Sequence, residues 1–232
     1  MRRARQQSQR YLGLPCDFFL RGLAGLLLPL ILLLLNASPA AAQEAGRIVS
    51  IVGKAEVYRA GQWQPARLHQ GLLPGDMVRP ARGSRVAILL ADESQIKVNA
   101  NSTLELKEIP PPRGKPVSVA AGLLKTILNL FSGEIWVRSP GEPLEIRTPA
   151  ATATIRGTEL NLSIGPAVES RLAVLEGTVE FHNPKGSLLV KAGEQATARI
   201  GDAPRKTVLV NPIDAIQWSL YYPGIVSFRD YP

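Results

Sequence analysis

The side chains best suited to catalysis are few and scattered in this chain. Its 232 residues include two histidines, His69 and His182, and one cysteine, Cys16. The histidines lie far apart, and each stands beside residues typical of turns. The patterns H-E-x-x-H, G-x-S-x-G and G-x-x-x-x-G-K-[ST], which hold a metal, a nucleophile or a phosphate, do not occur. Carboxylates are plentiful, but no spacing singles out an acid–base pair. We therefore expect no enzyme activity, no metal and no cofactor.

Two opposite charges flank a glycine where the neighbouring residues are small or apolar. Arg156 and Glu159 enclose Gly157 in this way. A charge in such surroundings must be paired or remain in water. We expect Arg156 to be partly buried and to pair with Glu159 or Glu176, because a guanidinium can form several hydrogen bonds at once. A staple between strands is one interpretation, and a contact with a ligand or partner is the other.

Alternation of apolar and polar residues from Gly46 onward predicts an all-β fold. Turn residues recur about every 8–12 positions, which is typical of a sandwich, barrel or solenoid. The run 85–90 is continuously apolar and predicts a strand buried on both faces. The segments 73–77 and 192–196 also resemble each other, because each places an acid after a glycine and before a strand. The expected strands are 47–52, 55–59, 76–79, 85–90, 95–98, 103–109, 134–138, 144–147, 160–164, 171–175, 178–181 and 188–191.

A short helix is expected inside the β region. The connector 110–116 contains three consecutive prolines, which cannot donate hydrogen bonds to a ladder and favour an extended chain. The helix that we expect over about 120–131 would plug one end of the β domain or bind a partner. Its apolar residues recur at helical spacing, at Ala120, Leu123, Leu124, Ile127, Leu128 and Phe131.

A second helix is expected near the C-terminus. Asn211-Pro212 is a favourable start, because asparagine caps a helix and proline fits its first turn. The segment 206–232 is also rich in aromatic residues. It either docks on the β domain or connects to a partner module, with Trp218, Tyr221 and Tyr222 as candidate contacts.

The N-terminal segment is typical of a secretory signal. Residues 1–42 combine several arginines, an apolar stretch over 22–35 and an Ala-x-Ala site that ends at Ala42. The apolar stretch is shorter than the roughly 20 residues that span a bilayer. We expect cleavage after Ala42, export to the periplasm or beyond, and only transient membrane contact. An uncleaved signal-anchor in the inner membrane is the alternative.

The basic composition does not indicate nucleic-acid binding. The formal net charge is +8, and five arginines against one aspartate in residues 1–42 account for half of it. Cys16 also lies in that segment, so the remaining chain has no disulfide. Its stability must come from an apolar core, for which about 190 residues suffice.

The stretch 148–160 carries a specific resemblance to a known family. It reads T-P-A-A-T-A-T-I-R-G-T-E-L, and V-L-E-G-T-V follows at 174–179. This combination is similar to the signature of the FecR-domain family. A glycine inside a strand pattern indicates a bulge or a close backbone approach, and we expect the tightest crossing of the fold at Gly157. The motif positions are Thr148, Pro149, Ala151, Ala153, Arg156, Gly157, Thr158, Glu159, Glu176 and Gly177.

The resemblance implies an extracytoplasmic module over residues 43–205. Its fold would be a twisted β-solenoid or sandwich with one inserted helix and a short C-terminal helix. The best-known members are membrane-anchored anti-sigma regulators that relay iron-uptake signals. This chain looks more like exported FecR-domain proteins, in which the domain can precede tetratricopeptide repeats. We therefore expect a non-enzymatic module that binds or scaffolds an envelope protein or polymer, including a repeat-containing protein. A membrane-anchored signalling subunit, related to the regulators of iron-uptake sigma factors, is the alternative.

Overall fold

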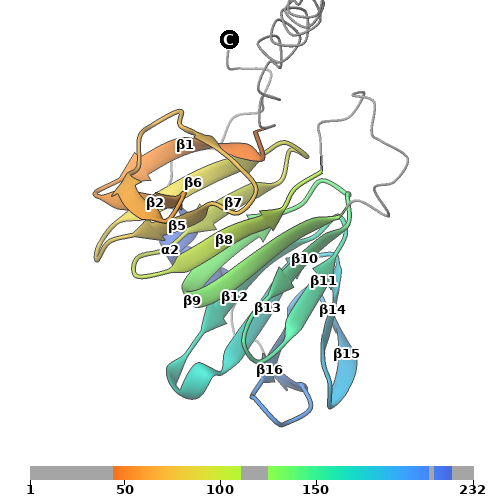
Figure 1. Ribbon diagram of the computed structural model, residues 1–232. Helices are drawn as coiled ribbons and strands as arrows, with labels where there is room; N and C mark the ends of the chain where they lie inside the picture. Colours follow the sequence, from red (N-terminus) through yellow and green to blue (C-terminus); the bar gives the residue numbers. More distant parts are fainter. Residues whose placement is uncertain (1–43, 111–124, 209–211, 221–232) are drawn as a thin grey trace, which may run out of the picture. The chain divides into compact units, whose positions relative to one another are not determined.

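The computed structural model describes residues 44–110, 125–208 and 212–220 (Figure 1). The chain divides into two compact units, 1–41 and 42–232. The first unit, with almost the whole predicted signal peptide, lies outside the described residues, as do most of the connector and Tyr221 and Tyr222. No described helix is both long and apolar enough to span a membrane.

The described residues form an all-β fold with one α-helix, as alternation predicted. Their strands belong to one mixed hydrogen-bonded sheet. The expected strands are present within about two residues of their predicted ends, except the one expected over 134–138, which begins eight residues earlier, at Thr126. The elements are β1 (Gly46–Val52), β2 (Ala55–Arg59), β3 (Gln62–Pro65), β4 (Gly71–Leu72), β5 (Met77–Pro80), β6 (Arg85–Leu90), β7 (Gln95–Val98), β8 (Thr103–Glu108), β9 (Thr126–Arg138), β10 (Leu144–Arg147), β11 (Thr152–Ile155), β12 (Glu159–Ile164), the 3₁₀ turn η1 (Pro166–Val168), β13 (Ser170–Glu176), β14 (Thr178–Asn183), β15 (Gly186–Lys191), β16 (Glu194–Ala198), β17 (Arg205–Val208) and α2 (Pro212–Leu220).

The strand β9 connects two sets of ladders. Its first half pairs with β8 and runs parallel to β10, and its second half pairs with β7 and β12. At the change-over, Gly133 has a φ of +84°. A Cβ at Gly133 would stand only 2.4 Å from the Cα of Ser102. Glycine is therefore required here both for its conformation and for the close approach of the two backbones.

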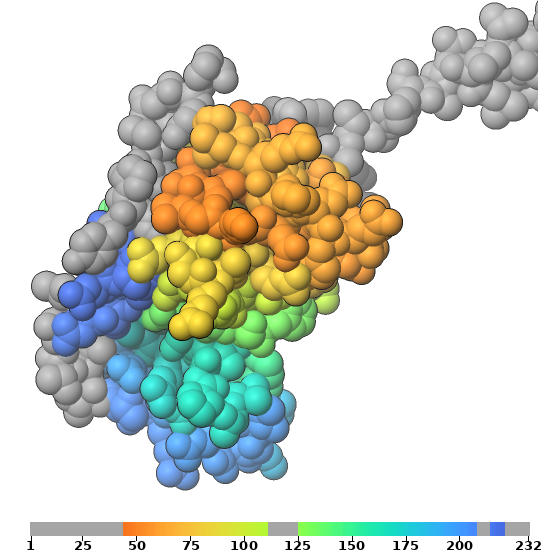
Figure 2. All heavy atoms as spheres, turned by 90° about the vertical axis from the view of Figure 1, so that its left-hand side faces the viewer, coloured from red at the N-terminus to blue at the C-terminus, as the bar shows by residue number. Residues whose placement is uncertain are grey.

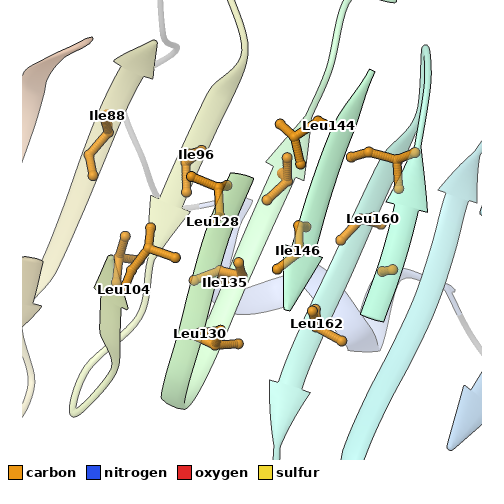
Figure 3. Packing of buried hydrophobic residues seen from close by; sticks show 14 of the residues in the cluster. Ile88, Ile96, Leu104, Leu128, Leu130, Ile135, Leu144, Ile146, Leu160 and Leu162 are labelled. Atoms are coloured by element: carbon orange, nitrogen blue, oxygen red, sulfur yellow. The ribbon is translucent and has the colours of Figure 1, made fainter. Parts of the chain in front are cut away.

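The two sets form layers that share one core. Layer A has the order β1-β6-β7-β9-β12-β13-β16-β17, with β4 beside β1. Layer B has the order β3-β2-β5-β8-β9-β10-β11-β14-β15. One continuous cluster of buried apolar side chains takes residues from both layers. It includes Ile88, Ile96, Leu104, Leu128, Leu130, Ile135, Leu144, Ile146, Leu160 and Leu162 (Figure 3).

This core is the source of stability in a chain segment without disulfides. Each fully buried leucine or isoleucine contributes about 1.5–3 kcal/mol relative to an exposed one. In β6 the five residues 86–90 are all buried, so the prediction of a strand covered on both faces is confirmed.

The predicted helix over 120–131 is wrong for the part that the structure describes. Residues 126–131 belong to β9, and 120–124 lie outside the described residues. The segment is paired with β8 on one side and β10 on the other. The sequence of such a central strand is a nearly continuous apolar run. Such a run also contains apolar residues at helical spacing, so periodicity alone misassigned it. Phe131, expected on the apolar face, is 50% exposed.

The C-terminal helix is confirmed over Pro212–Leu220. Asn211, its predicted cap, lies outside the described residues. The strand β17 spans the expected end of the β domain at residue 205, so the β structure continues to Val208.

The two similar segments noted in the sequence form the same kind of turn. The carboxylate of Asp76 accepts the N–H of Leu73 at 2.8 Å, and that of Glu194 accepts the N–H of Lys191 at 2.8 Å. In both turns the glycine before the acid has a positive φ. The acid therefore closes a four-residue turn in each case, immediately before β5 at Asp76 and at the first residue of β16 at Glu194.

Candidate partner-binding site

The first part of the family motif builds the turn between β10 and β11. The N–H of Thr148 donates to the carbonyl oxygen of Ala151 at 2.9 Å, and the N–H of Ala151 donates to Thr148 Oγ1 at 3.1 Å. Thr148 Oγ1 also lies 2.6 Å from Ser170 Oγ, at the start of β13. Pro149 occupies the turn, and Ala151 and Ala153 are buried. These motif residues therefore join a turn to the core.

The second part of the motif is a close contact between two turns. Gly157 has a φ of +60° and Gly177 a φ of +84°. A Cβ on Gly177 would stand 2.8 Å from the carbonyl oxygen of Gly157. Thr158 is buried beside them, and its hydroxyl donates to the carbonyl oxygen of Arg156 at 3.2 Å. The predicted close approach at Gly157 is present, but the two backbones lie closer together at Gly133 than at Gly157.

The expected burial and ion pair of Arg156 are wrong. Its side chain is exposed, and its Nε donates to the carbonyl oxygen of Gly141 at 3.1 Å. Within the described residues it forms no ion pair with Glu159 or Glu176. Gly157, with its positive φ, turns the chain directly after Arg156, and the side chain of Arg156 is exposed to solvent.

Glu159 has different partners from those expected. Its Oε1 accepts the indole N–H of Trp136 at 3.0 Å, and its Oε2 lies 4.0 Å from Arg138 Nε. Glu176 is its cross-strand neighbour in the β12–β13 ladder and is exposed. The carboxylate of Glu159 therefore interacts with residues on the outer face of layer A and does not pair with Arg156.

Three side chains on the outer face of layer A form a site that we call the α2 seat: Lys97, Trp136 and Asn161. They lie in one cross-strand row, because Lys97 and Asn161 are the register partners of Trp136 on its two sides. Alternation points them away from the core. Trp136 is nevertheless only 6% exposed and Asn161 only 5%.

The helix α2 docks on this seat through two directed hydrogen bonds. The indole N–H of Trp218 donates to Asn161 Oδ1 at 3.2 Å, and Lys97 Nζ donates to the carbonyl oxygen of Ser219 at 3.0 Å. The ammonium also lies 4.5 Å from the ring centre of Trp136. A cation is favourable at the C-terminal carbonyl groups of a helix. In Figure 2 the dark-blue atoms of α2 adjoin yellow and green atoms of the strands.

The amide of Asn161 is fixed from both sides. Its Nδ2 donates to Glu134 Oε1 at 2.9 Å, and the other carboxylate oxygen of Glu134 accepts from Asn99 Nδ2 at 2.7 Å. Because an ionised carboxylate only accepts, the nitrogen of Asn161 must face Glu134 and its oxygen must face Trp218. The seat therefore offers an acceptor at one defined place.

The charge of Lys97 is held partly away from water. Burial lowers the pKa of Lys97, and the negative charge of Glu159 opposes this shift. The ring of Trp136 and the carbonyl oxygen of Ser219 replace part of the lost hydration. Removing α2 would leave this ammonium and the amide of Asn161 without their partners in the helix.

The arrangement is suited to binding. In the described ranges no three histidine, cysteine, aspartate or glutamate side chains gather where they could hold a metal ion. His69 lies in an exposed turn and His182 on β14. Of the predicted partner contacts, Trp218 is docked on the module, whereas Tyr221 and Tyr222 lie outside the described residues.

Sequence reasoning missed the three residues of the α2 seat. One signal was available, since Trp136 alternates with Ile135 and Val137 and must face outward. A tryptophan on the outer face of a central strand needs a cover. Lys97 and Asn161 carried no such signal, because they come from strands that are distant in sequence.

The fold and the seat define an all-β module that carries a short helix on its outer face. Residues 76–180 match the family described as FecR protein. The matched range contains the whole 148–160 motif and the Leu-Glu-Gly of 175–177. The resemblance noted in the sequence is thereby confirmed for residues 76–180, which match the FecR family.

Other comparisons add little to this assignment. No curated protein matches the chain significantly. Two crystal structures of a protein from Parabacteroides distasonis ATCC 8503, provisionally described as an anti-sigma factor, resemble it with a TM-score of 0.47 and 17% identity. Each comparison covers 62% of this chain and 63% of the other, which is less than two thirds of that protein's length. A likeness at this level carries no functional information.

Proposed function

We propose that this chain is a FecR-type extracytoplasmic regulatory module that acts by binding a partner protein and not by catalysis. The family match over residues 76–180 supports a regulatory role, and it favours a signalling subunit over a passive scaffold. The α2 seat is the part of the module where binding of a partner is converted into a structural change.

The observation that carries this proposal is the dependence of α2 on its seat. The helix has nine residues, and isolated helices shorter than about 12–15 residues are marginal in water. Its contacts with the module include two hydrogen bonds, from Trp218 to Asn161 and from Lys97 to Ser219, and the burial of Ile216. Each hydrogen bond contributes about 0.5–1.5 kcal/mol net. A partner that binds either the seat or α2 can therefore shift the docking equilibrium.

Photo-crosslinking in the native host tests the proposal. A photoreactive amino acid replaces Leu220, which is 57% exposed at the end of α2, or Leu189, which is 56% exposed on β15 and serves as a matched control. The expected result is one envelope protein crosslinked from Leu220 and absent from Leu189. No crosslinked protein from Leu220, or the same proteins from both positions, would contradict the proposal.

The location of the module is a separate part of the proposal. Cleavage after Ala42 would release it to the periplasm or beyond, and an intact N-terminus would make it a membrane-anchored subunit. Mass spectrometry of the protein purified from the native host distinguishes the two. A chain starting at Gln43 supports release, and a chain starting at residue 1 supports the anchor.

A further inference from the structure

A groove lies at the C-terminal end of the edge strand β3 of layer B, on the other layer from the α2 seat. It consists of two open hollows of about 870 Å³ and 570 Å³, which adjoin at Pro65. The larger is lined by the β1–β2 turn and the ends of β2, β3 and β5, and the smaller by the loop after β3. Within the described residues β3 pairs with β2 alone. The groove therefore lies at an edge of layer B, and both of its hollows are open to solvent.

The charge along this groove is positive. Lys54 and Arg79 line the larger hollow and Arg67 lines the smaller, against one acid, Glu56. Lys54 and Arg67 are exposed, and their cationic groups have no ion-pair partner in the part of the chain that the structure describes. Two free cations on either side of Pro65 attract a ligand that carries repeated negative charges.

A third cation, Arg79, lines the larger hollow with Lys54 and is held in place by two contacts. The guanidinium carbon of Arg79 lies 4.0 Å from the ring centre of Trp63, and its Nη2 donates to Glu56 Oε2 at 2.7 Å. The ring of Trp63 is itself packed against Tyr58, with 5.2 Å between ring centres. The guanidinium is thus oriented before a ligand arrives, so less entropy is lost when its remaining N–H groups bind an oxyanion.

Neutral amides accompany the cations. Gln64 in the smaller hollow and Asn101 in the larger are exposed, and both present groups that donate to and accept from hydroxyls. The walls between them are small and apolar, with Ala55, Ala66 and Pro80 in the larger hollow. Cations, amides and small apolar walls together suit a chain that carries carboxylates, hydroxyls and C–H faces.

We propose that the β3 groove binds an acidic polysaccharide, with its carboxylates at Lys54, Arg79 and Arg67 and its hydroxyls at the neighbouring amides. This site is independent of the α2 seat. It gives the module an attachment to a carboxylate-bearing envelope polymer, while the seat remains available for a protein.

Calorimetric titration at low salt with polygalacturonate oligomers tests the site. The same oligomers with their carboxyl groups reduced to alcohols are the matched ligand control. Lys54→Gln/Arg67→Gln removes the two free cations. The control variant, Lys185→Gln/Arg205→Gln, removes two exposed cations elsewhere, one just before β15 and one at the start of β17. We expect binding of the acidic oligomers and a loss of about tenfold in affinity with Lys54→Gln/Arg67→Gln, because exposed ion pairs contribute modestly. Tenfold corresponds to about 1.4 kcal/mol. The control variant should bind normally, and the reduced oligomers should not bind.

Three results would overturn the inference. The first is no binding of polygalacturonate by the wild-type protein. The second is an equal loss of affinity in both double variants, which would mean attraction to the net charge alone. The third is equal or tighter binding of poly-L-glutamate or single-stranded DNA, which would show that the groove does not recognise a saccharide. Because all four substituted side chains are exposed, unchanged thermal unfolding of both variants would confirm that folding is intact.

Discussion

The carbonyl oxygen of Gly157 lies 2.8 Å from the point where a Cβ on Gly177 would stand. This contact joins the two halves of the family motif, because Gly157 belongs to Arg-Gly-Thr-Glu and Gly177 to Leu-Glu-Gly. The N–H of Ala192 then donates to the carbonyl oxygen of Gly177 at 3.0 Å. The β11–β12, β13–β14 and β15–β16 turns therefore stack against one another, and the glycines of the motif permit this stacking.

Gly177→Ala is expected to destabilise the protein by about 2–4 kcal/mol, from the sum of left-handed strain and overpacking. Gly201→Ala is the matched control, because Gly201 has a φ of +90° but no atom within 4 Å of its would-be Cβ. Only the strain of about 1–2 kcal/mol applies there. Urea unfolding of both variants measures the difference, and equal losses would show that the backbone contact with Gly157 is unimportant.

The two related turns predict a contrast between Asp76 and Glu194. Asp76 is 3% exposed and accepts from Arg59 through both carboxylate oxygens as well as from Leu73. Asp76→Asn leaves the guanidinium of Arg59 without its counter-charge and should cost about 2–4 kcal/mol.

Glu194→Gln removes the equivalent ion pair with Lys206 in a solvated turn. We expect a much smaller loss, since exposed ion pairs contribute little. Thermal unfolding of the two isosteric variants tests this order. A larger loss for Glu194→Gln would contradict the burial that the structure assigns to Asp76.

At acid pH the free energy of unfolding should fall partly because Glu169 becomes protonated. Hydrogen bonds from Arg171 and Arg199 lower the pKa of the Glu169 carboxyl. A carboxyl with a lowered folded-state pKa stabilises the protein above its unfolded pKa, and this contribution is lost as the pH falls through the folded pKa.

Glu169→Gln should therefore be less stable than the wild type at neutral pH and should show a shallower fall below the ordinary glutamate pKa of about 4.3. Denaturant unfolding across acid pH measures both curves. Parallel curves would mean that the arginines do not hold the carboxylate ionised. The variant Glu180→Gln, at an exposed site on β14, is a suitable control.

Arg156→Ala separates the two interpretations of the motif arginine. Its side chain is exposed and makes one hydrogen bond, to Gly141. We expect the free energy of unfolding to change by no more than about 0.5 kcal/mol. Calorimetric unfolding checks this value. A loss of several kcal/mol would restore the interpretation as a staple, whereas a small loss leaves partner contact as its role.

The strands were predictable because alternation reports burial on one face. β7 and the first four residues of β8 show this directly, since partly buried and fully buried residues alternate as polar and apolar residues do in their sequences. β9 was not predictable by that argument. Its first half is a central strand with apolar residues in succession, so its period is ambiguous until its pairing with β8 and β10 is known.

The site was less predictable than the fold, because its residues meet only after pairing. Lys97 and Asn161 become neighbours of Trp136 through ladders that a single sequence does not specify. Arg156 was misjudged for a related reason. Its apolar surroundings in sequence suggested burial, but its side chain is exposed directly before the turn at Gly157.

Hydrogen exchange of the α2 amides, in the wild type and in Asn161→Ala, tests the docking claim most directly. The variant removes the acceptor of the Trp218 indole and one donor to Glu134. If α2 is a separately releasable element, its amides lose protection in Asn161→Ala while those of β12 and β13 keep theirs. If α2 and these strands exchange together in both proteins, or if α2 keeps its protection in the variant, the proposed release of α2 from its seat is wrong.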